Sequence, residues 1–135
     1  MSLVTLRCIE GMKIECTHNE SGAKFTAATP AMYNGSGDSF SGTDLCAMSL
    51  GVCASTVMGV FARDNGIDIS GMVVDLDKIM QAGPRRIGGI KVVFRMPDRP
   101  YSHEEKQALK QSIESCPVCL TLKGVEQTIE FDWKS

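Results

Sequence analysis

The chain has 135 residues, of which 43% are hydrophobic and 22% charged, and these proportions are typical of one globular domain. Its formal net charge of −2 argues against a nucleic-acid or anionic-membrane partner, because both require a basic surface. The opening segment, MSLVTLRCIEG, lacks the basic and apolar regions of a secretory signal. We therefore expect a single cytoplasmic domain over residues 1–135.

Cysteine is frequent for an intracellular chain, with residues Cys8, Cys16, Cys46, Cys53, Cys116 and Cys119. In the absence of an export signal, free thiols in a reducing compartment are favoured over a disulfide framework. Most of these cysteines lie inside apolar runs, where a free thiol behaves as a small hydrophobic side chain. We expect most of them to fill the core, so that any functional thiol must be identified individually.

The first quarter of the chain has the alternating pattern of short strands. Apolar residues alternate from Val4 to Cys8 and again from Met12 to Cys16, and turn-like residues separate these runs. Residues 4–28 are therefore predicted to form two or three antiparallel strands. Residues 29–42 are rich in Pro, Gly, Ser and Asn and are predicted to form a loop.

A long uncharged helix is predicted next. Ser41 is a suitable N-cap, Asp44 falls in the first turn, and Leu45–Ala62 carries no charge before Gly66 ends the helix. Its many small residues argue against a membrane span. A helix that is apolar all round must be buried all round, and one sheet covers only one flank. A partner subunit is then needed for the other flank, so the helix predicts a homodimer.

The second half of the chain is predicted to contain two strands, a polar helix, a short helix and a closing strand. Ser102 and Glu105 have the spacing of a capping box, and Pro117 favours a new helix start. The expected ranges are Ile67–Ile79, Ile87–Met96, Ser102 to about Ser115, Pro117–Lys123 and Gln127–Trp133. The order of elements indicates an α+β protein.

Cys116-Pro117-Val118-Cys119 is the most specific local motif. With proline at the first helical position, Cys116 becomes the N-cap, where unpaired N–H groups stabilise a thiolate. A Cys-x-x-Cys pair can also close its own disulfide. Zinc is less expected, because a closed structural site needs four ligands and the sequence has no second such pair.

Cys53 lies in the middle of the apolar helix, where the ordinary interpretation is a core residue. It is about 15 Å from the helix start at 1.5 Å per residue, so the helix dipole does not activate it. Residue chemistry alone would not single it out. His18 and His103 are both expected at the surface.

Two segments resemble the OsmC-like family, which includes the organic hydroperoxide resistance proteins. Residues 41–53, SGTDLCAMSLGVC, are similar to the family's S-P-x-E-L-L-x-A-A-L-G-x-C helix, and residues 116–122, CPVCLTL, are similar to its C-P-V-S-x-x-L motif. The spacing of the two cysteines and the order of elements also fit. The resemblance implies an OsmC-like fold, in which an antiparallel sheet wraps a long buried central helix and two chains form an intertwined dimer.

The same resemblance implies a thiol peroxidase active in oxidative-stress defence. Cys53 would be the peroxidatic thiol and Cys116 the resolving thiol, an external dithiol would reduce their disulfide, and no metal or organic cofactor would be needed.

The chain departs from the family pattern at three points. Active peroxidases of the family carry a Glu where this chain has Thr43, with Asp44 one residue later. They also carry an early Arg, for which Arg7 is not a convincing match. Cys119 replaces the motif's serine and is a competing resolving thiol. Two alternatives therefore stay open: a catalytically weak redox-sensing or ligand-binding module, and a dithiol protein that uses Cys116 and Cys119.

Overall fold

The computed structural model describes residues 1–134 and divides into two compact units, residues 1–45 and the chain from Cys46 onward. The single domain expected over 1–135 stays a prediction.

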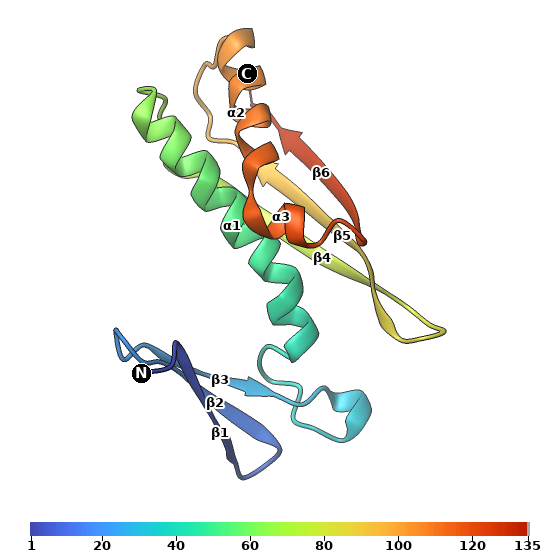
Figure 1. The fold of residues 1–135 in the computed structure, drawn as a ribbon. Helices are drawn as coiled ribbons and strands as arrows, with labels where there is room; N and C mark the ends of the chain where they lie inside the picture. Colours follow the sequence, from blue (N-terminus) through green and yellow to red (C-terminus); the bar gives the residue numbers. More distant parts are fainter. Residues whose placement is uncertain (135) are drawn as a thin grey trace. The chain divides into compact units, whose positions relative to one another are not determined.

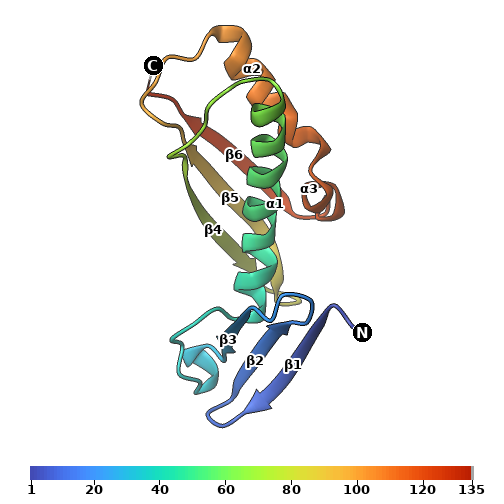
Figure 2. The same cartoon turned by 90° about the vertical axis from the view of Figure 1, so that its left-hand side faces the viewer.

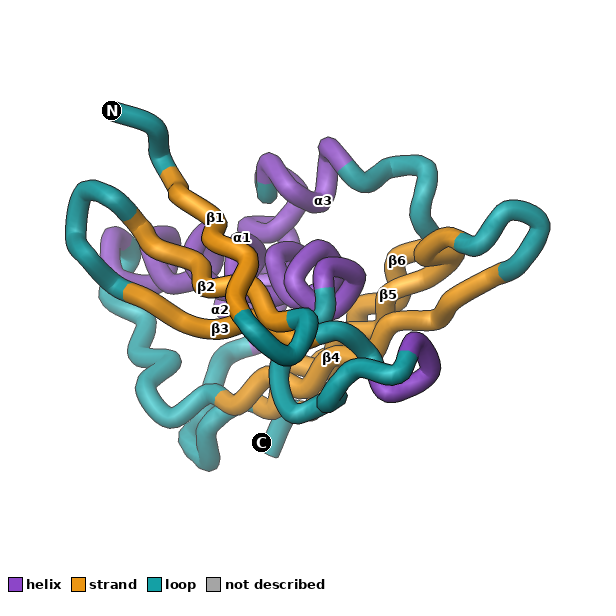
Figure 3. The backbone as a smooth tube through the Cα atoms, turned by 90° about the horizontal axis from the view of Figure 1, so that it is seen from below, coloured by secondary structure: helices purple, strands orange, loops and turns teal. Residues whose placement is uncertain are grey.

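The N-terminal unit is built on a three-stranded antiparallel sheet. Strands β1 (Val4–Ile9), β2 (Lys13–His18) and β3 (Lys24–Ala28) pair in the order β1-β2-β3 (Figure 3). Gly11 and Met12 take positive φ angles of 79° and 56° in the tight turn between β1 and β2, which suits glycine at the first of them. The predicted strands are confirmed, and the loop that follows contains only a 3₁₀ turn, Ala31–Tyr33.

Helix α1 (Gly42–Asp64) begins at a reciprocal cap. The Asp44 N–H donates to the Ser41 hydroxyl at 3.2 Å, and the Ser41 N–H donates to the Asp44 carboxylate at 2.9 Å. These bonds satisfy N–H groups that have no partner within the helix. Past the C-terminus, Gly66 takes a φ of +67°, a conformation that glycine adopts without steric cost.

Only one stripe of α1 is buried within this chain: Ala47, Leu50, Gly51, Ala54, Met58 and Ala62. The helix is long and apolar enough to cross a membrane by length and composition, a test that core helices of soluble proteins also pass, and 33% of its apolar window is buried. Burial on all sides, as the sequence predicted, is therefore not reached by a single chain.

The C-terminal unit contains a mixed three-stranded sheet. Strand β4 (Val73–Gln81) pairs antiparallel with β5 (Arg86–Arg95), and β5 pairs parallel with β6 (Glu126–Asp132). The expected antiparallel arrangement thus fails for the last pair. A helical crossover returns the chain to the same end of the sheet, which makes the pairing parallel. Strand β4 also begins later than predicted, because residues 67–72 form an irregular segment.

Three helices pack on one face of this sheet (Figures 1 and 2). Helix α2 (His103–Ser112) begins at the predicted capping box of Ser102 and Glu105, and a 3₁₀ turn, Ile113–Ser115, leads to the short α3 (Pro117–Thr121). The predicted helix starts are confirmed.

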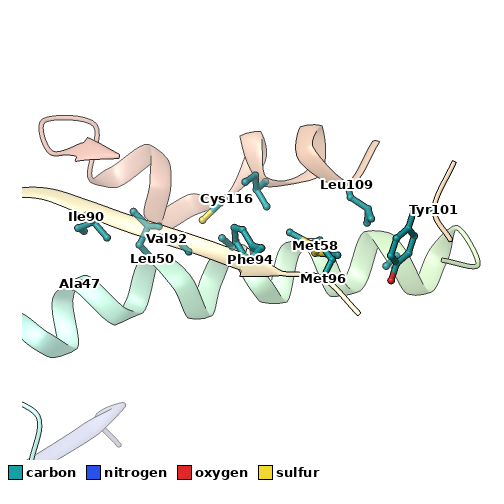
Figure 4. Close-up of a cluster of buried hydrophobic side chains, with 13 residues drawn as sticks. Ala47, Leu50, Met58, Ile90, Val92, Phe94, Met96, Tyr101, Leu109 and Cys116 are labelled. Carbon is teal, nitrogen blue, oxygen red and sulfur yellow. The ribbon is translucent and has the colours of Figure 1, made fainter. Parts of the chain in front are cut away.

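The core lies between the sheet and the helices. Alternate residues of β5, namely Ile90, Val92 and Phe94, are at most 1% exposed and meet Leu50 and Met58 of α1 (Figure 4). Leu109 of α2 and Cys116 belong to the same cluster. The opposite face of the sheet carries charged side chains, including the ion pairs of Lys91 with Glu130 and of Arg95 with Asp132. The C-terminal unit is thus a two-layer structure, and the predicted α+β class is confirmed.

Candidate active site

Cys53 lies on the core-facing side of α1. Its neighbours on the helix, Leu50 and Ala54, are fully buried, whereas Cys53 itself is half-buried. Its side chain packs against the cluster that contains Cys116. The structure therefore brings together the two cysteines that the motifs singled out, from elements far apart in the sequence.

Cys116 is 0% exposed and is the N-cap of α3, as the motif predicted. Its N–H donates to the carbonyl of Ile113 at 3.0 Å, which closes the preceding 3₁₀ turn. The Cys119 N–H donates to Cys116 Sγ at 3.3 Å. Pro117 needs no partner for its nitrogen and suits the first helical position. The cysteine sulfur is thus held at a fixed place in the core.

The pKa of Cys116 is lowered from its ordinary value. Burial opposes the thiolate, but hydrogen bonding from the Cys119 side chain, the Cys119 N–H, the Cys53 side chain and the Val118 N–H together outweigh burial. A sulfur that accepts several hydrogen bonds favours its charged form, so Cys116 can act as a nucleophile in the form of its thiolate.

The pKa of Cys119 is shifted in the opposite direction to that of Cys116. Burial raises the pKa of this thiol to about 12, and the hydrogen bond to Cys116 and the negative charges of Cys116 and Cys53 contribute to the rise. In the reduced protein Cys119 therefore keeps its proton and supports the Cys116 thiolate.

A cavity of about 750 Å³ opens beside Cys119, lined by Lys110, Ile113, Glu114, Cys119, Leu120, Lys123, Val125, Gln127, Ile129, Phe131 and Trp133. Phe131 and Trp133 stack with ring centroids 5.3 Å apart, and the Lys110 ammonium lies 6.0 Å from the Phe131 ring centroid. The Gln127 side chain donates to the carbonyls of Cys119 and Leu122 and ties α3 to β6. The cavity thus joins a mainly apolar wall to a thiol.

Sequence reasoning did not identify this cavity. The alternation of Ile129, Phe131 and Trp133 showed which face of the last strand is apolar, but not that α2 and α3 leave part of that face uncovered. The position of Lys110 in the predicted helix gave no sign that it stands over an aromatic ring.

The side chains of Thr43 and Asp44 lie at the start of α1 and are not next to Cys53 on the helix. The Asp44 carboxylate caps the start of α1, and residue 44 precedes Cys53 by about 13.5 Å of helix at 1.5 Å per residue. The Thr43 hydroxyl lies 3.2 Å from that of Ser41. Arg7 is an exposed residue of β1 in the N-terminal unit. Within the C-terminal unit, the partners of Cys53 and Cys116 are therefore thiols, backbone groups and apolar side chains.

The other cysteines differ from expectation. Cys16 is buried, but Cys8 and Cys46 are exposed, so the prediction that most thiols fill the core is wrong for these two. Each lies on a face of its strand or helix that this chain does not cover. His18 and His103 are exposed, as predicted. Among residues 1–134, no group of three or more His, Cys, Asp or Glu side chains is arranged to hold a metal ion.

Comparison with known proteins places the chain in a family. A model of the OsmC family, described as OsmC-like protein, matches residues 35–130. A crystal structure from Psychrobacter arcticus 273-4, described as an osmotic stress induced and detoxification response protein, is 26% identical, with a TM-score of 0.91 over 97% of this chain and 96% of that chain.

More distant structures share the fold. An OsmC-like protein from Mycoplasma pneumoniae has a TM-score of 0.80 at 16% identity, covering 98% of this chain and 96% of that one. An organic hydroperoxide resistance protein, OsmC, from Legionella pneumophila has a TM-score of 0.69 at 16% identity, covering 98% of both chains. No curated protein matches the sequence. The model match over most of the chain confirms the resemblance drawn from the two cysteine motifs: this protein belongs to the OsmC-like family.

Proposed function

We propose that this protein reduces organic hydroperoxides in the cytoplasm with Cys53 as peroxidatic thiol and Cys116 as resolving thiol. Membership of the OsmC-like family, in which a similar structure is named an organic hydroperoxide resistance protein, supports hydroperoxide resistance as its general role. One observation carries the assignment of the pair: half-buried Cys53 packs against the cluster that contains buried Cys116, and its side chain helps to lower the pKa of Cys116.

Exposure and ionisation favour this division of roles. The thiol that meets a hydroperoxide needs access to solvent, and Cys53 has more of it than Cys116. The resolving thiol must attack a neighbouring sulfur as a thiolate, and the lowered pKa of Cys116 supplies one.

The reaction proceeds in two steps. The Cys53 thiolate attacks the outer oxygen of the hydroperoxide, the O–O bond breaks, and Cys53 becomes a sulfenic acid while the alkoxide takes up a proton and leaves as an alcohol. The Cys116 thiolate then attacks the sulfenic sulfur, and the hydroxyl group leaves with a proton as water. An external dithiol returns two electrons and two protons to the oxidised protein and is itself oxidised to a disulfide.

A homodimer is part of this proposal. The outward side of α1 is uncharged along Val52, Thr56 and Val60, and Val52 is 57% exposed. A groove beside it is lined by Met48, Gly51, Val52, Ser55, Thr56, Val74 and Leu76. Every residue of β1 is exposed as well. A second copy of the chain would cover such apolar surface, which single folded chains rarely leave open.

The test is turnover of cumene hydroperoxide with dihydrolipoamide by the purified protein. We expect peroxide consumption that Cys53→Ser abolishes. Cys46→Ser is the matched control, because Cys46 is an exposed thiol on the same helix, and it should keep the wild-type rate. Turnover that survives Cys53→Ser would remove Cys53 from the mechanism.

A second candidate is a redox-sensing or ligand-binding module. It is favoured by the helix cap that engages Asp44 away from Cys53 and by the cavity beside Cys119. This function predicts oxidation of Cys53 by one equivalent of hydroperoxide without sustained turnover in the presence of the dithiol.

A further inference from the structure

A third thiol, Cys119, adjoins the proposed pair on the side of the cavity. Its N–H donates to Cys116 Sγ at 3.3 Å, and the side chains of Cys119 and Cys53 both help to lower the pKa of Cys116. Cys116 is thus the common neighbour of the other two cysteines. Thiol–disulfide exchange needs such an arrangement, in which an attacking sulfur reaches one sulfur of an existing disulfide.

The three thiols differ in their access to a reductant. Cys116 is 0% exposed, so an external dithiol has no path to its sulfur. Cys53 and Cys116 do not line the cavity, whereas Cys119 does, beside Gln127 and Leu120. A disulfide that includes Cys119 therefore offers a sulfur at the wall of a cavity of about 750 Å³, large enough for a small dithiol.

We propose that Cys119 takes over the disulfide from Cys53, so that a small dithiol reduces a Cys116–Cys119 disulfide from the cavity. The Cys119 thiolate attacks Cys116 Sγ, the Cys116–Cys119 bond forms, and the Cys53–Cys116 bond breaks with Cys53 leaving as a thiolate. The proton lost by Cys119 goes to solvent, and the protein neither gains nor loses electrons in this exchange. The dithiol then attacks Cys119 Sγ, donates two electrons and two protons, and leaves as a disulfide.

Oxidation itself prepares Cys119 for the attack. In the reduced protein the hydrogen bond to Cys116 and the charges of Cys116 and Cys53 help to raise the pKa of Cys119, after burial. Once those two sulfurs are joined, neither carries a negative charge, and these contributions disappear. Oxidation of the pair thus removes part of the rise in the pKa of Cys119, while the contribution of burial remains.

The exchange rests on the proposed function, so the experiment has two arms. Reduced wild-type protein is oxidised with one equivalent of cumene hydroperoxide in one arm and with oxidised dithiothreitol in the other. Free thiols are then alkylated, and peptides are mapped by mass spectrometry without reduction. We expect Cys116–Cys119 as the end product in both arms, with Cys53 alkylated. In Cys119→Ser that product is lost and Cys53–Cys116 accumulates.

The outcomes separate the two proposals. A wild-type end product of Cys53–Cys116 with alkylated Cys119 overturns the exchange and leaves the hydroperoxide reaction standing. A protein that forms no disulfide with hydroperoxide, but does so with oxidised dithiothreitol, overturns the hydroperoxide reaction and the exchange with it. The wild-type map alone decides between these, so the result does not depend on whether Cys119→Ser folds.

Discussion

The backbone N–H of Cys119 donates to Cys116 Sγ at 3.3 Å, so the second cysteine of the motif stabilises the thiolate of the first. The side chains of Cys53 and Cys119 also help to lower the pKa of Cys116. A buried thiol whose pKa is lowered by its neighbours can react as a thiolate, unlike a cysteine that only fills space in the core. Two of the residues that influence its ionisation, Cys53 and Cys119, also take part in the proposed chemistry.

The rate of disulfide formation should reflect the lowered pKa of Cys116. An ordinary thiol titrates near pH 8.5, so attack on the Cys53 sulfenic acid would slow below about that pH. Because the Cys116 thiolate is present at lower pH, we expect the rate to hold as the pH falls below that value and to decrease only when Cys116 itself is protonated. Single-turnover oxidation followed by rapid acid quench and peptide mapping measures this rate.

Cys116→Ser supplies the control for that measurement. When this variant also carries Cys119→Ser, neither resolving thiol is left, so the Cys53 sulfenic acid should persist and be trapped by dimedone, whereas wild-type protein should give little adduct. A resolution rate that declines from about pH 8.5 downward, as for an ordinary thiol, would contradict the prediction.

The Cys119 thiol should lower the folding stability of the reduced protein at alkaline pH. Its pKa is raised to about 12 in the folded state, chiefly by burial, while the unfolded thiol ionises near pH 8.5. Below the unfolded value both states are protonated and stability is independent of this group. As the pH rises above it, the unfolded state loses its proton first and is favoured, so folding stability falls.

Replacing this thiol tests the effect. Under reducing conditions, urea denaturation of wild-type protein and Cys119→Ala should give unfolding free energies whose difference changes between neutral and alkaline pH, with the wild type losing more. A difference that stays constant across that range would show that the folded state does not hold the Cys119 proton.

Leu109 should contribute strongly to stability. Its side chain is 0% exposed in the cluster between α2 and the sheet, and truncation of a buried leucine costs about 2–5 kcal/mol because a cavity remains. Leu120 is the matched control, since it is 49% exposed. Leu109→Ala should lower the urea midpoint clearly, and Leu120→Ala should lower it far less. Equal shifts would mean that the core is not centred on this cluster.

The helix starts were predicted correctly because each depends on residues that are close together in the sequence. The Ser41–Asp44 and Ser102–Glu105 pairs lie within one helical turn, so the chemistry that starts each helix is visible from a few residues. The same holds for Pro117 after Cys116. The pairing of Cys53 with Cys116 was predicted only from the family motifs, because no local sequence pattern indicates that these two residues are close in space.

Non-local features were harder to predict. The direction of β6 relative to β5 depends on where α2 and α3 return the chain, and strand patterns are the same for both directions. Ile67 and Ile69 were predicted to lie in a strand, but they belong to an irregular segment, from which their side chains pack against the core. Cys46 is exposed because the sheet covers another side of α1. The sequence does not indicate which side is covered, because the helix has no polar face.

The outward side of α1 should hold two chains together. Val52 is 57% exposed in the single chain, so Val52→Glu should be tolerated by an isolated subunit. In a dimer packed through this side, the same change buries an unpaired charge, which costs several kcal/mol. We expect sedimentation equilibrium to give twice the chain mass for wild-type protein and a single chain for Val52→Glu. Gln107→Glu, on the exposed side of α2, should leave the mass unchanged, and a Val52→Glu protein that stays dimeric would place the contact between subunits elsewhere.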